Sequence, residues 1–117
     1  MPLRVSSHPL VADTLARLRD RRTGHDEFRA LSGRVITMLA YEATKDLETR
    51  QTTVETPLAE AAAWVLSRQV VAVPVLRAGL GLLGPVMDLL PGVSVGYLGL
   101  ERDERTAVAR IYYNKLP

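Results

Sequence analysis

The sequence contains no cysteine, few aromatic residues and no uninterrupted hydrophobic segment of membrane-spanning length. The absence of cysteine excludes disulfide bonds and thiolate metal sites, and it fits a reducing compartment. The longest apolar stretch, Val70 to Leu100, is interrupted by Arg77, Asp88 and several glycines and prolines. These interruptions favour strands that are buried on both faces over a membrane span. The amino terminus lacks the apolar segment of a signal peptide, so we expect a cytoplasmic protein.

The composition is that of a single soluble domain. A chain of 117 residues can bury one core but not two, and 47% hydrophobic with 24% charged residues argues against disorder. The formal net charge is +2, yet the basic residues are scattered among acids and form no continuous stripe. We therefore expect no nucleic-acid partner and no membrane partner.

The first part of the chain is predicted to be mainly helical. Pro9 suits the first position of a helix, and apolar spacing predicts a second helix over about residues 26–47. The stretch TTVET, 52–56, is typical of a short edge strand. The following LAEAAAWVLS, 58–67, predicts a helix that carries Trp64 into the core.

The central part predicts a βαβ unit. A strand from Val70 to Leu76 is followed by a glycine turn, a helix ending near Leu90, and a second strand from Val93 to Leu100. The segment between the strands is long enough for the crossover that a parallel pair needs. The tail, residues 101–117, is expected to form a projecting loop or hairpin.

The glycine turn after the first strand allows two interpretations. Its glycines at 79, 81 and 84 match G-x-G-x-x-G, and Glu101 follows the next strand as a ribose-binding acid would, which indicates a dinucleotide site. Against this, Arg77 and Ala78 separate the strand from the first glycine. Pro85 also follows the third glycine, where close packing of helix on strand is wanted.

The other interpretation is a diphosphate site. Backbone N–H groups of a small-residue turn at the carboxyl end of a parallel strand can bind anionic oxygens, and the next helix begins there. Arg77 would add a planar set of donors for phosphate. A purely structural alternative is that Arg77 leaves a buried strand only to pair with an acid such as Glu101.

A family resemblance favours the diphosphate site. The chain resembles, in order, the amino-terminal half of the uracil phosphoribosyltransferases in HPLV 8–11, LRDRRTG 18–24, EFR 27–29, YEATKDL 41–47, VETPL 54–58, VPVLRAGLG 73–81, VGYLGLERDERT 95–106 and YYNKLP 112–117. These enzymes make UMP and diphosphate from uracil and 5-phosphoribosyl 1-diphosphate with Mg²⁺, in pyrimidine salvage. The resemblance implies an α/β fold in which amino-terminal helices, 1–68, precede the βαβ unit, 69–101, of an incomplete type I phosphoribosyltransferase sheet and a projecting arm, 102–117.

The same resemblance implies the site residues. Arg77, Ala78 and Gly79 would form the diphosphate loop, with a non-proline cis peptide bond placed at Leu76–Arg77, and Arg102 would reach the same group from a mobile arm. Lys115 is expected to be only a solvated lysine. No catalytic residue and no metal ligand are assigned in this chain. A homo-oligomer, and GTP as an allosteric activator, are further expectations.

Departures from the family pattern leave alternatives open. Glu101 stands where the family usually has an aromatic residue. The family also usually has an acid directly before the glycine that Pro85 follows in this chain. The chain ends at KLP, before the family's ribose 5-phosphate motif and uracil-binding segment, so we expect the amino-terminal half of an enzyme, inactive by itself. A non-catalytic nucleotide or diphosphate sensor and a dinucleotide-binding half-domain are the competing hypotheses.

Overall fold

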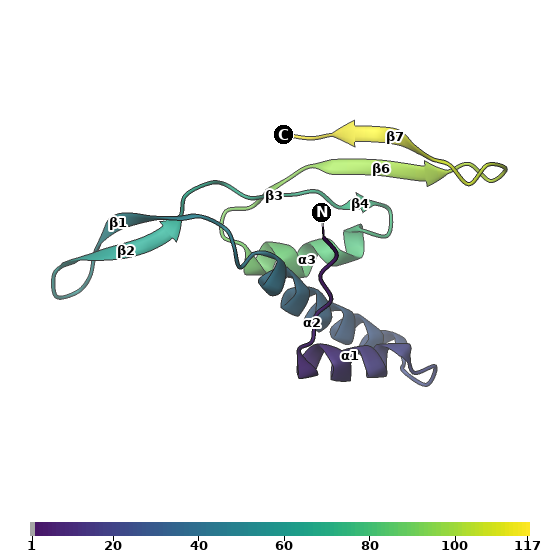
Figure 1. Ribbon diagram of the computed structural model, residues 1–117, viewed down its shortest axis with the longest axis horizontal. Helices are drawn as coiled ribbons and strands as arrows, with labels where there is room; N and C mark the ends of the chain where they lie inside the picture. The colour runs from purple at the N-terminus through teal and green to yellow at the C-terminus, as the bar shows by residue number, and fades with distance from the viewer. Residues whose placement is uncertain (1) are drawn as a thin grey trace.

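The computed structural model describes residues 2–117, which form three helices and seven strands. Figure 1 shows three helices stacked on one side, and two hairpins that project at opposite ends of the 63 Å long axis. The elements are α1 Pro9–Arg19, α2 His25–Ala43, β1 Thr49–Glu55, β2 Glu60–Leu66, β3 Val71–Ala72, β4 Val75–Leu76, α3 Leu80–Leu89, β5 Ser94–Val95, β6 Tyr97–Arg102 and β7 Ala109–Lys115.

The structure confirms the two helices predicted for the first part of the chain. Pro9 is the first residue of α1, and the side chain of His8 caps this helix by accepting a hydrogen bond from the Leu10 N–H at 3.1 Å. Helix α2 ends at Ala43 rather than near residue 47. The Thr44 hydroxyl donates to the Ala40 carbonyl, and the chain turns so that the Leu47 N–H bonds to the Thr44 carbonyl instead of continuing the helix.

The helix predicted over residues 58–67 is wrong, because this segment is a β-strand. Strand β2 pairs antiparallel with β1, from Thr49 opposite Leu66 to Glu55 opposite Glu60. The backbone ladder and the β-branched residues of β1 outweigh the helical propensity of the alanines. The amino-terminal region, 1–68, is therefore helical only as far as Ala43.

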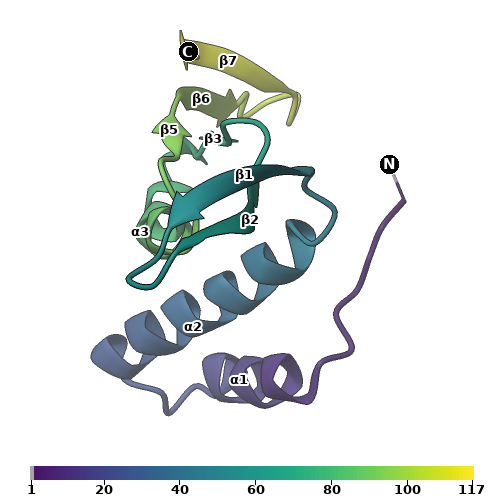
Figure 2. The ribbon, with the colours of Figure 1, turned by 90° about the vertical axis from the view of Figure 1, so that its left-hand side faces the viewer.

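Trp64 is not a core residue either. It lies on the β1–β2 hairpin with 67% of its surface exposed. The hairpin contacts chiefly itself and projects away from the helices in Figure 1, and it faces the viewer in Figure 2. No second layer therefore covers the side chain within the described part of the chain.

The predicted βαβ unit is confirmed, with both of its strands broken into two short pieces. Strand β3 pairs in parallel with β5, and β4 pairs in parallel with β6, with α3 as the crossover. The Gly96 N–H donates to the Ala72 carbonyl at 3.0 Å, but Pro74 has no N–H to complete the next step of the ladder. The Pro74 carbonyl still accepts from the Leu98 N–H, so the two halves stay in one register.

The tail forms the predicted hairpin. Strand β7 pairs antiparallel with β6, with a register irregularity between Gly99 and Leu100. The ring of Tyr112 lies over Gly99, where an added Cβ would come within 2.7 Å of the Tyr112 Cζ. The hairpin thus lengthens the sheet by one strand, in the order β4-β6-β7.

The buried core lies mainly between α1 and α2, and it is small. Val11, Leu31, Val35 and Leu90 are the buried apolar residues, while Val73 and Val75 in the sheet keep 40% and 43% of their surface exposed. No helix among residues 2–117 is long and apolar enough to span a membrane. Sheet residues in an α/β fold are normally covered on both faces, so much apolar surface is open here.

We expect the isolated chain to self-associate because of this open apolar surface. Sedimentation at increasing protein concentration should show a rising average mass rather than a fixed monomer. A monodisperse monomer that unfolds in one cooperative thermal transition would contradict the expectation.

Candidate functional site

The loop after β4 is a tight turn that leads directly into α3. The Gly79 N–H donates to the Val75 carbonyl at 2.8 Å, and the Leu80 N–H donates to the Arg77 carbonyl at 3.1 Å. The Leu76–Arg77 peptide bond is cis, as predicted. Arg77, Ala78 and Gly79 therefore lie together at the carboxyl end of a parallel strand and at the start of a helix.

Gly79 is the glycine that this geometry requires. A Cβ at this position would lie 2.4 Å from the Val75 carbonyl oxygen and 2.6 Å from the Val75 nitrogen, which are backbone atoms that cannot rotate away. At Gly81 and Gly84 an added Cβ meets nothing within 4 Å. A dinucleotide fingerprint uses its third glycine for close packing of helix on strand, so open space at Gly84 argues against that interpretation.

Arg77 is exposed, and the residues described here include no ion-pair partner for it. Glu101, the acid considered for it, is bound instead by Arg110, whose Nε donates to the Glu101 Oε1 at 2.7 Å. These two residues are directly opposite each other in the β6–β7 ladder. The structural alternative for Arg77, pairing with Glu101, is therefore not what the structure shows.

An apolar cavity of about 610 Å³ adjoins the loop. Its lining runs from Ala72 to Gly79 and continues on α3 with Leu82, Leu83 and Val86. Arg77 carries the only charged side chain in this lining. An anion bound in the cavity could therefore form an ion pair with one lining side chain, that of Arg77.

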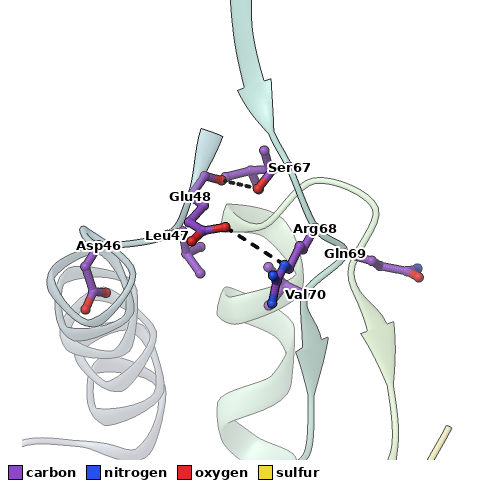
Figure 3. Close-up of a pocket in the computed structure, with 8 residues that line it drawn as sticks. Asp46, Leu47, Glu48, Ser67, Arg68, Gln69 and Val70 are labelled. Carbon is purple, nitrogen blue, oxygen red and sulfur yellow. Dashed lines mark hydrogen bonds and ion pairs between the residues drawn. The ribbon is translucent and has the colours of Figure 1, made fainter. Parts of the chain in front are cut away.

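A second cavity, of about 330 Å³, lies at the base of the β1–β2 hairpin and was not anticipated from the sequence. Figure 3 shows the side chains around it, among them Glu48, Ser67 and Arg68. The Ser67 hydroxyl donates to the Glu48 carbonyl at 3.2 Å, and the Arg68 Nε lies 3.9 Å from a Glu48 carboxylate oxygen. Both charged side chains are well exposed, so this pair contributes little to stability.

Arg102 ends β6, on the strand next to the loop. Leu76, the residue before Arg77, pairs with Gly99, so Arg77 and Arg102 both follow the paired part of β4 and β6 at the same end of the sheet. Arg102 forms no ion pair among residues 2–117, so it does not pair with its neighbours Asp103 and Glu104. Both arginines thus keep their donors available to a ligand.

Asp103 folds the tip of the arm, and sequence reasoning missed this role. Its carboxylate accepts from the backbone N–H groups of Arg105 at 2.8 Å and Thr106 at 3.1 Å. These backbone hydrogen bonds lower the pKa of Asp103 below its ordinary value. The signal in the sequence was an aspartate at the start of a polar turn, which is the usual Asx-turn pattern.

We expect the turn at Asp103 to loosen in acid and in the Asp103→Ala variant. Because its pKa is lowered in the folded state, the carboxylate stabilises the turn above the unfolded pKa, and that contribution is lost as pH falls through the folded pKa. The protection factors of the Arg105 and Thr106 amides, which correct for the intrinsic pH dependence of hydrogen exchange, should therefore fall in both cases. Glu104→Ala is the matched control and should leave these two amides unchanged; an equal fall in both variants would contradict the assignment.

Comparison with known proteins gives a family. The family model described as uracil phosphoribosyltransferase matches residues 5–117. The chain belongs to the uracil phosphoribosyltransferase family. A relative with that name from Streptomyces avermitilis is 47% identical over 118 residues, covering 100% of this chain and 56% of the relative, and one from Campylobacter fetus subsp. fetus is 44% identical over 115 residues, covering 98% and 55%.

A solved structure shares the fold of this chain. The structure of the AQ2163 protein from Aquifex aeolicus superposes with a TM-score of 0.87 at 34% identity, covering 96% of this chain and 54% of that one. The predicted α/β class, with helices before an incomplete sheet, is confirmed. The chain spans about half the length of the curated uracil phosphoribosyltransferases it matches.

Proposed function

We propose that this chain provides the diphosphate-binding part of a uracil phosphoribosyltransferase, which converts uracil and 5-phosphoribosyl 1-diphosphate to UMP and diphosphate. The observation that supports it is the loop Arg77–Gly79, which lies between a parallel strand and a helix and carries an arginine with no ion-pair partner among residues 2–117. Family membership adds the name of the reaction. The full activity needs more chain than these residues contribute, because the relatives are nearly twice as long.

Each of the three loop residues has a different role in binding the diphosphate. The Arg77 guanidinium supplies charge-assisted hydrogen bonds to phosphate oxygens. The Gly79 N–H is already bonded to the Val75 carbonyl, so Gly79 contributes space for the turn rather than a donor. The Ala78 N–H has no partner among the described residues and is the backbone donor that we assign to the diphosphate.

Arg102 would approach the same diphosphate from the β6–β7 arm. Negative charge develops on the leaving diphosphate as the glycosidic bond breaks, and fixed cationic donors stabilise it. The family resemblance implies that Mg²⁺ accompanies the phosphoribosyl donor. Bound to that donor, the ion would neutralise part of the diphosphate charge.

Further features of the whole enzyme are part of the proposal. We expect a role in pyrimidine salvage in the cytoplasm, and a homo-oligomer. GTP as an allosteric activator stays a prediction from the resemblance.

A second candidate is a diphosphate-binding protein without catalysis. It is favoured by one observation, namely that the described chain corresponds to only about half of each relative. Such a protein would bind 5-phosphoribosyl 1-diphosphate through Arg77 and release it unchanged.

Joining the carboxy-terminal half of the Streptomyces avermitilis relative to this chain tests the proposal. With uracil, 5-phosphoribosyl 1-diphosphate and Mg²⁺, the joined protein should form UMP, whereas the 117-residue chain alone should form none. Donor binding to the chain by calorimetry, with no UMP from the joined protein, would favour the second candidate. An absence of both binding and turnover would reject both.

Arg102→Ala should lower kcat/KM for the phosphoribosyl donor in the joined protein, with a raised KM. Part of the binding energy of an arm residue goes into ordering the arm, so we expect a loss of roughly tenfold, smaller than that for a donor fixed in the loop. Arg105→Ala, on the same arm, is the control. Equal effects in both variants would indicate general weakening of the arm.

A further inference from the structure

The β6–β7 hairpin, which projects at one end of the molecule in Figure 1, contains one extra residue. At its base, Gly99 is opposite Tyr113. The next residue, Leu100, is opposite Ile111, so Tyr112 of β7 has no partner in β6. An unpaired residue of this kind is a β-bulge, and it moves every later pair by one residue. We call the pairing beyond the bulge the shifted register.

The charges near the tip of the hairpin favour the shifted register. In it, Glu101 is opposite Arg110, and Arg102 is opposite the small Ala109. If the pairing at the base continued without the bulge, Arg110 would instead be opposite Arg102. Opposite charges directly across a ladder stabilise the pairing, and like charges destabilise it. The shifted register therefore has a glutamate–arginine pair where the unshifted one would have two facing arginines.

The contact between Glu101 and Arg110 is made in the structure. The Arg110 Nε donates to the Glu101 Oε1 at 2.7 Å, and the Nη2 of the same guanidinium also contacts this oxygen. An exposed ion pair contributes little to overall stability. It can still decide between two registers, because one of them gains the pair and the other sets two arginines against each other.

Burial does not fix the register of this hairpin. All seven residues of β7 are exposed, whereas register is strongly specified only where one face of a strand is buried. The ring of Tyr112 lies over Gly99, where an added Cβ would collide with it, and this contact locates the bulge. Beyond the bulge, the Glu101–Arg110 contact is the one hydrogen bond between side chains of β6 and β7 among residues 2–117.

We propose that Glu101 and Arg110 are positioning residues for Arg102. Side chains alternate between the two faces of a strand, so Arg102 lies on the face opposite to the ion pair. By holding β7 in the shifted register, the ion pair keeps Arg110 off that face and leaves Ala109 beside Arg102. The Arg102 guanidinium then approaches an anion without a second arginine that repels it. The inference rests on the proposed function for the role of Arg102, and on the hairpin alone for the register.

Disulfide formation between introduced cysteines measures the register in the 117-residue chain, which has no cysteine of its own. Leu100→Cys with Ile111→Cys reports the shifted register, because directly opposite residues are within disulfide range. Leu98→Cys with Asn114→Cys reports the base of the hairpin and is the internal control. Alkylation followed by mass spectrometry separates crosslinks within one chain from those between chains.

Arg110→Glu should slow crosslinking at the 100/111 pair by roughly tenfold. The shifted register would then oppose two glutamates, while the unshifted one would gain an attraction between Arg102 and the new carboxylate. The rate at the 98/114 pair should stay within about twofold. Adding Glu101→Arg to Arg110→Glu restores an ion pair in the shifted register, so most of the rate should return. Arg105→Glu makes the same change of charge on the same arm and should leave the 100/111 rate within about twofold.

Glu101→Gln in the joined protein tests the positioning role. This variant removes a negative charge, so net charge alone would favour an anionic donor and lower its KM. Loss of the ion pair should instead raise the KM for 5-phosphoribosyl 1-diphosphate by roughly threefold, with kcat changed less. In the Arg102→Ala background the same substitution should have no further effect, because the residue that it positions is absent.

The two sets of measurements fail separately. An unchanged 100/111 rate in Arg110→Glu, an equal loss in Arg105→Glu, or no recovery in the double variant would overturn the register assignment. A lowered KM in Glu101→Gln, or an equal effect with and without Arg102, would overturn the positioning role. Crosslinking uses no diphosphate, so a joined protein that forms no UMP refutes the proposed function and leaves the register result standing. If Arg110→Glu also slows the 98/114 pair, Glu101→Gln decides the register, with an expected loss of roughly threefold at the 100/111 pair alone.

Discussion

Arg77→Ala, in the protein completed with the carboxy-terminal half, should lose about 2.7–4 kcal/mol of transition-state stabilisation, which is roughly 100- to 1000-fold in kcat/KM for the phosphoribosyl donor. Arg77 carries the only charge in the cavity lining and has no ion-pair partner within residues 2–117, so no other side chain of the loop can replace it. Uracil binding should change little. Steady-state kinetics with each substrate varied in turn measures both effects.

Arg77→Lys separates charge from geometry. A lysine keeps the positive charge but not the planar set of donors, so only part of the activity should return. Thermal unfolding of both variants is the control for stability. Near-normal donor kinetics together with a lowered Tm would mean that Arg77 serves the fold, and the diphosphate-loop assignment would fail.

Gly79→Ala should be almost as damaging, although it removes no donor. The new Cβ would collide with the Val75 backbone at 2.4 Å and 2.6 Å, so the turn and the adjacent Ala78 N–H have to move. A displacement of about 1 Å in a binding loop costs on the order of 100-fold in rate. The loss should appear in kcat/KM for the phosphoribosyl donor.

Gly84→Ala is the control for that variant. Gly84 lies within α3, and a Cβ there meets nothing within 4 Å. Because no other part of the fold is displaced, alanine at this position should leave donor kinetics unchanged. Similar kinetics for the two variants would show that the close approach at Gly79 does not matter for binding.

Local signals in the sequence predicted several features correctly. Pro9 marked the start of α1, and the apolar run with its glycine turn predicted the βαβ unit. The motif around Arg77 led to the family, to which the chain belongs. These features succeed because each depends on neighbouring residues: a fixed proline φ, the crossover length, and the small residues of a tight turn.

The sequence by itself determined the first two helices and the position of the loop with Arg77, because propensity and spacing over a few residues suffice for them, and its motifs carried the resemblance to the family. Only the tertiary structure decided the conformation of residues 60–66, where pairing with β1 overrode the helical preference of three alanines and left Trp64 exposed. It also decided that Glu101 binds Arg110, since a cross-strand partner depends on the register of β6 with β7. Register, ladder bonds and burial are set by residues far apart in the chain, which is why local patterns do not reveal them.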